Sequence, residues 1–331
     1  MKKFSVFLTL IICISLMTGC SGTVPLSFDA NRPWRIFSTI QSPCAEEMTY
    51  RVEIFAGTTD DTRLTKETSF YKVTLKEGKT NVGDEVALTA TVDTVMTINY
   101  RDDLDFADKG LTDVIETKVI FRLDNLSALY SYRKVTLADR ANEQNDSYEV
   151  TMDYVNKTST ITYHNGKTKT MKLKNSSPVY DNEMTYYLVR SFSTVKVGES
   201  DSFKIVNGYE NFLDGGYSAT SLKATTENTV DVRVDKKIFD LVSTSEDAFE
   251  KPVDGETEYY ITCFRTQISL ASKKSGPPMF SYMSRGAFVS GGTNTTYKVP
   301  VALVNYQYDI DGNTTYTQMC TLTDYSAYGN Y

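Results

Sequence analysis

Side chains that commonly carry catalysis are scarce in this sequence. His164 is the only histidine among 331 residues, and it directly precedes Asn165 and Gly166, a pair typical of a tight hairpin turn. A Ser-His-Asp or Cys-His site would have to be built around His164, yet the tip of a hairpin is a mobile place for a general base. We therefore expect His164 to face solvent, and we predict that the protein is not an enzyme.

Metal ligands in suitable patterns and phosphate-binding loops are also missing. The densest acidic group is Asp102, Asp103, Asp105 and Asp108, whose spacing matches no calcium loop and favours a solvated turn. When Gly312 is aligned with the sixth position of a calcium loop, Gln307 is first and Gln318 is twelfth, where acids are needed, so residues 309–313 favour a hairpin turn. No glycine-rich loop is followed by Lys-Ser or Lys-Thr. The sequence thus predicts neither a metal ion nor a cofactor.

Cysteine is rare, and its number after residue 20 is odd. Cys44, Cys263 and Cys320 allow at most one intramolecular disulfide bond. Cys263 with Cys320 is the first candidate pair, because both lie in expected strands of the C-terminal part. The alternative is that all three are buried thiols that behave as small apolar groups. A disulfide-stapled scaffold is excluded in either case.

Apolar runs long enough to cross a membrane are absent, and the longest run lies at the N-terminus. Two lysines precede the apolar residues 4–17, and small residues then lead to Cys20. Residues 16–20 (Leu-Met-Thr-Gly-Cys) resemble the bacterial lipobox, with methionine where leucine is usual. That resemblance implies a signal peptide over residues 1–19 and a diacylglycerol group on the Cys20 thiol; the alternative is an ordinary secretory signal. We expect a flexible tether over residues 20–33 and a single β-rich extracytoplasmic domain over residues 34–331.

The charge balance limits the range of partners. Without residues 1–19 the chain has 33 basic and 42 acidic residues, a formal net charge of −9. Such an acidic surface does not suit nucleic acid or anionic lipid headgroups. The predicted partners are therefore the membrane, reached through the N-terminal lipid, and a ligand of the extracytoplasmic domain. The predicted location is the outer side of the cell membrane.

Most of the chain has the pattern of β-strands separated by polar turns. Apolar side chains alternate with polar ones around Tyr50, Val52 and Ile54, as in strands that bury one face only. We predict a mainly β fold, a large curved antiparallel sheet or open half-barrel with one or two helices packed on its concave face. The clearest strands are residues 49–56, 69–75, 85–100, 114–123, 147–155, 258–270 and 297–308; two hairpins join 158–164 to 167–173 and 299–308 to 314–323.

One helix is expected to interrupt the strands. Asp181 is a suitable N-cap, and Glu183 suits the positive end of the helix. A weaker helix is expected within residues 237–250, and sub-domain breaks could fall near 175–180 or 245–256. The residues at helical spacing on the apolar face, which we expect to border a ligand groove, are Met184, Tyr187, Leu188 and Phe192.

Residues 179–192, 275–282, 298–301 and 316–325 resemble segments of a family of uncharacterised exported bacterial proteins. In that family an open, strongly curved antiparallel sheet wraps around a helix, as in the lipoprotein carriers and receptors of the bacterial envelope. The resemblance covers residues 115–325 and transfers no catalytic residue. It implies a shape in which a helix occludes an apolar groove.

The sequence is compatible with three hypotheses of function. The leading one is a non-enzymatic binding protein for an apolar or amphipathic ligand, such as a lipid or an acylated segment. The alternative is a protein that binds glycans or cell wall, since some of the 23 tyrosines should reach solvent, although cross-strand packing accounts for most of them. The third is a hydrolase with two facing carboxylates, which needs a pocket that holds both.

Overall fold

The computed structural model describes residues 44–78, 95–107, 112–122, 125–138, 146–173, 180–190, 197–213, 219–271, 278–291, 294–309 and 313–329. The expected signal peptide, Cys20 and the expected tether lie outside these residues, as do Asp108, Phe192 and residues 85–94 of one expected strand. No helix within the described ranges combines the length and the apolar character needed to cross a membrane.

The described part of the chain is mainly β. The strands are β1 (Cys44–Phe55), β2 (Phe70–Gly78), β3 (Val95–Asp105), β4 (Thr112–Arg122), β5 (Ala128–Thr136), β6 (Tyr148–Asp153), β7 (Thr158–Tyr163), β8 (Thr168–Lys172), β9 (Tyr180–Asp181), β10 (Ser200–Val206), β11 (Thr220–Val234), β12 (Ala248–Val253), β13 (Glu256–Leu270), β14 (Met279–Ser284), β15 (Phe288–Ser290), β16 (Asn294–Thr296), β17 (Pro300–Tyr308) and β18 (Thr314–Gly329). The helical elements are the 3-10 turn η3 (Asn182–Met184), α1 (Thr185–Arg190), α2 (Gly208–Leu213) and α3 (Lys236–Phe239).

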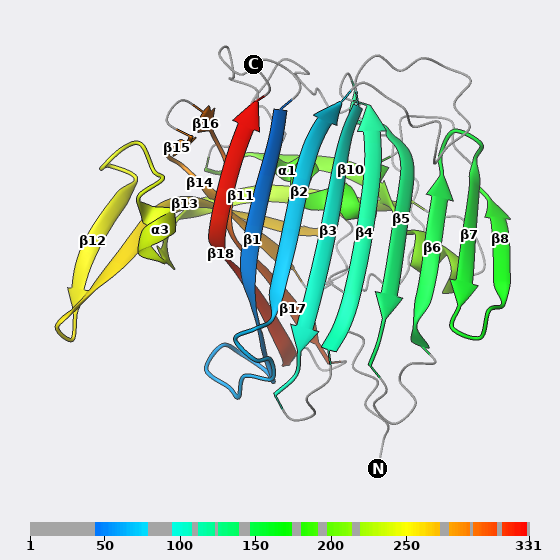
Figure 1. The fold of residues 1–331 in the computed structure, drawn as a ribbon, viewed down its shortest axis with the longest axis horizontal. Helices are drawn as coiled ribbons and strands as arrows, with labels where there is room; N and C mark the ends of the chain where they lie inside the picture. Colours follow the sequence, from blue (N-terminus) through cyan, green and yellow to red (C-terminus); the bar gives the residue numbers. More distant parts are fainter. Residues whose placement is uncertain are drawn as a thin grey trace.

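One large open sheet contains all of these strands except β15 and β16. Its order is β8-β7-β6-β5-β4-β3-β2-β1-β18-β17-β14-β13-β11-β10-β9, and β12 also pairs with β13. Strands β1 to β8 and β18 form a front layer, and β10, β11, β13 and β14 run behind it at a steep angle (Figure 1). All pairs are antiparallel except β9 with β10, which run parallel, so the sheet is mixed rather than purely antiparallel. The expectation of a mainly β fold with a large curved sheet is confirmed.

Alternation along the strands decides which side chains form the core. In β1, Tyr50, Val52 and Ile54 are at most 1% exposed, whereas Arg51 and Glu53 are only partly buried. Successive side chains of a strand point to opposite faces, so the first three face the interior of the curved sheet and the other two face outward. The interior face and the helical segment that it encloses form one continuous core.

The back strands curl and then project away from the front layer. The N-terminal half of β13 pairs with β11 on one side and β12 on the other, and this three-stranded projection with α3 extends to the left in Figure 1. An ion pair of 2.7 Å between Lys237 Nζ and Asp324 Oδ1 ties the base of the projection to β18. The projection and the outer face of β18 and β17 therefore form a concave corner outside the core.

The structure changes the expected local elements in several places. Asp181 caps the helical segment as expected, its side chain accepting a hydrogen bond from the Glu183 amide, and the described part of the segment is a 3-10 turn followed by six α-helical residues. The expected helix over residues 237–250 is limited to α3, because the later residues pair with β13 as β12, and α2 was not expected. Strands before and after each stretch suggested as a sub-domain break belong to the same sheet, and residues 175–179 of the first stretch lie outside the described residues.

Both expected hairpins are confirmed, as β7–β8 and β17–β18. Between β7 and β8 only Gly166 has a positive φ, of 77°, so the turn is wider than the expected two-residue type. His164 at this turn is exposed, as expected.

Candidate functional site

The helical segment over residues 182–190 lies inside the curved sheet and is fixed at both ends by buried ion pairs. Near its start, Arg133 Nη1 of β5 lies 2.9 Å from Glu183 Oε2. At its end, the two Nη atoms of Arg190 bind the two carboxylate oxygens of Glu46 on β1 at 2.7 and 2.8 Å, and Tyr325 on β18 donates a hydrogen bond to the same carboxylate. Arg190 is only 2% exposed. A bidentate guanidinium–carboxylate pair is geometrically specific, so the segment has one defined position against the front layer.

Asp181 strengthens this attachment at the start of the helical segment. Its carboxylate accepts hydrogen bonds from the hydroxyl groups of Ser131 and Tyr154 and from the backbone amide of Glu183. Burial raises the pKa of Asp181 above its ordinary value of 3.8, and the nearby Glu183 carboxylate raises it further, whereas the hydrogen bonds lower it. These hydrogen bonds link Ser131 on β5, Tyr154 directly after β6 and Glu183 in the 3-10 turn.

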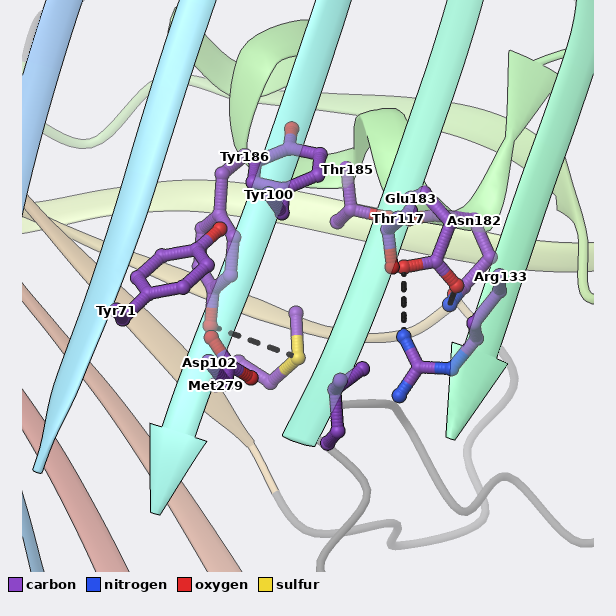
Figure 2. Close-up of a pocket in the computed structure, with 11 residues that line it drawn as sticks. Tyr71, Tyr100, Asp102, Thr117, Arg133, Asn182, Glu183, Thr185, Tyr186 and Met279 are labelled. Carbon is purple, nitrogen blue, oxygen red and sulfur yellow. Dashed lines mark hydrogen bonds and ion pairs between the residues drawn. The ribbon is translucent and has the colours of Figure 1, made fainter. Parts of the chain in front are cut away.

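A small polar cavity lies between this segment and the front layer. Its volume is about 30 Å³, and residues of β2 to β5, the helical segment and β14 surround it (Figure 2). A space of this size suits one or two water molecules. The lining residues are Tyr71, Tyr100, Asp102, Ile115, Thr117, Arg133, Asn182, Glu183, Thr185, Tyr186 and Met279.

Asp102 is the unusual group in this cavity. It is 3% exposed, and its Oδ1 atom has no hydrogen-bond partner among the described residues. Burial raises its pKa from 3.8 to about 7, although the positive charge of Arg133 acts in the opposite direction. The expectation of a solvated turn was therefore wrong for Asp102. Residues 102 to 105 continue strand β3, and the alternation of side chains along this strand turns Asp102 inward. The neighbouring Asp103 faces outward and forms an ion pair of 2.9 Å with Arg101.

Asp102 and Glu183 are the two carboxyl groups that a hydrolase hypothesis would use. Both line the cavity, but its volume of about 30 Å³ admits no sugar ring. Glycoside hydrolysis needs the scissile bond to lie between the two carboxyl groups. The cavity is large enough for one or two water molecules but not for a sugar between the two carboxyl groups.

A second and much larger space, which we call the outer groove, lies in the concave corner outside the core. Its volume is about 750 Å³. Strand register places one row of its floor residues side by side across five strands, and Met319 and Val304 form part of the next row. The first row is Arg51, Thr321, Ala302, Tyr282 and Arg265, from β1, β18, β17, β14 and β13 respectively. The remaining lining residues are the consecutive residues of β11 and the position after it, Val230, Asp231, Val232, Arg233, Val234 and Asp235.

The floor of the outer groove is apolar in the middle and cationic at both ends. The Nε atoms of Arg51 and Arg265 are buried, and neither has a hydrogen-bond partner in the described part of the chain. Arg51 lies 3.7 Å from Glu53, and Arg265 lies 3.3 Å from Glu227. Both ion pairs are longer than good hydrogen bonds, and the two arginine side chains are 38% and 32% exposed, so the exposed part of each guanidinium group keeps donor capacity for a ligand.

The residues expected to border a groove on the helix lie elsewhere. Met184 and Leu188 are fully buried and Tyr187 is 4% exposed, all three as part of the core, and Phe192 lies outside the described residues. The opposite side of the same segment borders the polar cavity, through Asn182, Glu183, Thr185 and Tyr186. The helical spacing identified the buried side of the segment, but that side packs against the sheet, and no apolar groove borders it within the described ranges.

The candidate disulfide between Cys263 and Cys320 was wrong. Both are free and buried thiols, at 0% and 1% exposure. Strands β14 and β17 separate β13 from β18, and alternation places Cys263 on the outer face with Arg265 but Cys320 on the interior face with Val52. Two cysteines on opposite faces and three strand spacings apart, about 14 Å along the sheet, cannot meet the geometry of a disulfide bond. The alternative of buried apolar thiols holds for these two residues. The side chain of Cys44 is not among the side chains that the structure describes.

Tyrosine serves mostly as core. Tyr50, Tyr71 and Tyr148 are each at most 4% exposed, and Tyr71 stacks on Tyr100 with ring centroids 5.7 Å apart. Among the tyrosines whose side chains the structure describes, Tyr308 is exposed, at 39%. The expectation that cross-strand packing accounts for most tyrosines agrees with these positions.

No protein-family model and no curated protein matches this chain. Among solved structures, it is similar to a β-barrel-like protein of the domain of unknown function DUF1849 from Brucella abortus, with a TM-score of 0.39 and 8% identity over 88% of this chain and 100% of that chain. A likeness this distant transfers neither ligand nor activity, and it places the chain in no lipoprotein family.

Proposed function

We propose that this chain is a membrane-anchored extracytoplasmic lipoprotein that binds an amphipathic ligand without chemical change, and that the outer groove holds this ligand. The observation that carries the proposal is the groove of about 750 Å³, whose floor has Ala302, Val304 and Met319 in its middle and Arg51 and Arg265 at its ends. Ligand sites of about 300 to 1,000 Å³ typically combine apolar walls with a few polar groups that orient the ligand. An apolar body with an acidic group matches this floor.

The interior of the sheet is a less suitable ligand site. The helical segment lies within it, and the cavity between this segment and the front layer has a volume of only about 30 Å³. A ligand there would have to displace a segment held by the buried Arg190–Glu46 and Arg133–Glu183 pairs. Binding in the outer groove requires no such displacement.

Ligand binding is tested with a dansyl-labelled fatty acid and the purified protein, together with extraction of compounds that co-purify. The substitution Ala302→Phe fills the middle of the groove, and we expect it to weaken binding at least about tenfold, which corresponds to about 1.4 kcal/mol. Thr74→Phe is the matched control, because Thr74 lies on the same outer face on β2, away from the groove lining, and this variant should bind within about twofold of the wild type. If no probe binds, extracts are empty and both variants behave alike, the proposed function is wrong.

Anchoring is tested separately with Cys20→Ser. Because the lipid would be joined to the Cys20 thiol, we expect the substitution to move the protein from the membrane fraction to the soluble fraction. Mass spectrometry of the wild-type N-terminus should find an acylated cysteine. An unmodified thiol in an uncut chain would contradict the lipoprotein assignment while leaving the groove untouched.

Glycan binding is the second candidate, and exposed aromatic pairs favour it. On the three-stranded projection, Phe249 stacks on Tyr260. Their ring centroids are 5.5 Å apart, the two ring planes form an angle of 9°, and Phe249 is 37% exposed. Flat exposed rings are suited to stacking on sugars. Retention on peptidoglycan that is lost in Phe249→Ala would favour this candidate over the amphipathic ligand.

A further inference from the structure

The outer groove runs along an unpaired strand edge. Strand β11 pairs with β10 only as far as Thr225, with one further pair of hydrogen bonds from Thr226 to Gly198 and Glu199. A bulge follows, and residues 228–234 of β11 pair with β13 on one side. On the other side no described strand pairs with this stretch. Half of its backbone N–H and C=O groups therefore point away from β13 without a strand partner.

The unpaired edge adjoins the groove directly. Val230, Asp231, Val232, Arg233 and Val234 are consecutive, and all of them line the groove. Successive side chains of a strand point to opposite faces, so a space bordered by five consecutive residues lies beside the strand and not only over one face. A ligand in the groove consequently has access to the backbone of β11.

The composition of this edge is suited to pairing. Residues 228–234 (Asn-Thr-Val-Asp-Val-Arg-Val) contain three valines, a threonine and no proline. Natural proteins cover such edges or interrupt them with proline, because free ladder groups recruit other strands. By contrast, β12, another edge of the projection, contains Pro252.

We infer that the occupant of the outer groove is an extended peptide segment that adds to the free edge of β11 as an extra strand. This inference rests on the proposed function, since it names the ligand class of the same groove. An acyl chain would leave the backbone groups of residues 228–234 to water, whereas a peptide satisfies them and also presents side chains to the floor. Strand addition of this kind takes its affinity from main-chain hydrogen bonds and its specificity from alternate side chains.

The floor defines which side chains the peptide carries. The lining of the groove combines apolar side chains, Ala302, Val304 and Met319, with the guanidinium groups of Arg51 and Arg265. A segment that adds to β11 shares the groove with both kinds of side chain. We therefore expect it to carry apolar residues together with acidic ones.

The first test uses fluorescence anisotropy with the full-length protein and a labelled, end-blocked peptide of sequence Asp-Glu-Val-Thr-Val-Glu-Asp. Two further peptides carry N-methyl groups on alternate residues, one on the odd and one on the even positions. Only one of these sets faces β11, so we expect one N-methylated peptide to bind at least tenfold more weakly and the other to bind like the parent. Equal affinities of the two methylated peptides would overturn the inference.

The second test locates the pairing and the charges. Hydrogen exchange of residues 228–234 should slow at least fivefold with the peptide, while β8, which is also an edge strand, should not change. Arg51→Gln and Arg265→Gln should each weaken binding of the acidic peptide about tenfold. Neither substitution should change the affinity for a peptide that has glutamine at the acidic positions. Arg101→Gln, on the outer face of β3 outside the groove lining, is the matched control and should change nothing.

The outcomes separate this inference from the proposed function. If the dansyl-labelled fatty acid binds and Ala302→Phe weakens it, but the peptides neither displace it nor protect residues 228–234, the peptide assignment is wrong and the groove remains a ligand site. If neither probe binds, both proposals are wrong. Peptide binding with protection of β11 and loss in Arg51→Gln supports both.

Discussion

Replacing Asp102 by asparagine should stabilise the protein at high pH and have little effect at low pH. The carboxyl group is 3% exposed, and its pKa rises from 3.8 to about 7 on folding because burial disfavours the charged form. The folded state thus binds a proton more tightly than the unfolded state. The stability that the protonated group contributes is fully present below pH 4 and is lost as the pH rises through 7.

The magnitude follows from this difference in pKa. Each tenfold difference in proton affinity corresponds to about 1.4 kcal/mol, so the wild type loses about 4 kcal/mol of unfolding free energy through this group between acidic and alkaline pH. Asparagine has the shape of the protonated acid and does not ionise. We therefore expect Asp102→Asn to raise the free energy of unfolding by about 4 kcal/mol at pH 8 and by only about 1 kcal/mol at pH 4.5.

The assay is urea unfolding of both proteins at a series of pH values, compared as differences so that all other titrating groups cancel. Asp103→Asn is the matched control, because Asp103 is the next residue on β3 but faces outward in an ion pair with Arg101; its effect should stay within about 0.5 kcal/mol at every pH. A gain from Asp102→Asn that is the same at pH 4.5 and pH 8, or a loss at pH 8, would refute the reasoning that burial dominates this group.

Two further predictions concern the buried ion pair and the thiols. Arg190→Met should lower the free energy of unfolding by about 3 to 5 kcal/mol, since it leaves the buried Glu46 carboxylate without its bidentate partner. Adding Glu46→Gln should recover part of the loss, and chemical denaturation measures both; additive losses would contradict the coupling. Cys263 and Cys320 should resist thiol reagents in the folded protein and react in urea, and a reductant should leave Tm unchanged, because both are free and buried. A peptide map with a disulfide between them would refute the assignment.

Several local elements were predictable from the sequence because short-range interactions decide them. Alternation in Tyr50, Val52 and Ile54 predicts a half-buried strand, and Asp181 caps its helical segment by a hydrogen bond only two residues away. The glycine at 166 supplies the positive φ that ends the β7–β8 turn. In each case the physical cause lies within a few residues of the feature.

The candidate sites were not predictable in the same way. Alternation gives two faces to every strand, but which face is covered depends on how the sheet curves. Asp102 in a run of acids looked solvated, yet β3 turns it toward Arg133 and the helical segment. The apolar side of that segment was recognised from its spacing, but whether it meets the sheet or a ligand depends on the other strands.

Sequence alone determined the strand-rich composition, the alternation, the turns and the helix cap, because these depend on propensities and hydrogen bonds between near neighbours in the chain. Only the tertiary structure decided that β1, β18, β17, β14 and β13 lie side by side. This strand order places Arg51 and Arg265 in one groove. It also places the free thiols of Cys263 and Cys320 on opposite faces of the sheet. The pairing of β1 with β18 places Arg51 beside Thr321, 270 positions later in the chain, and it is fixed by the burial of one continuous core that no short segment specifies by itself.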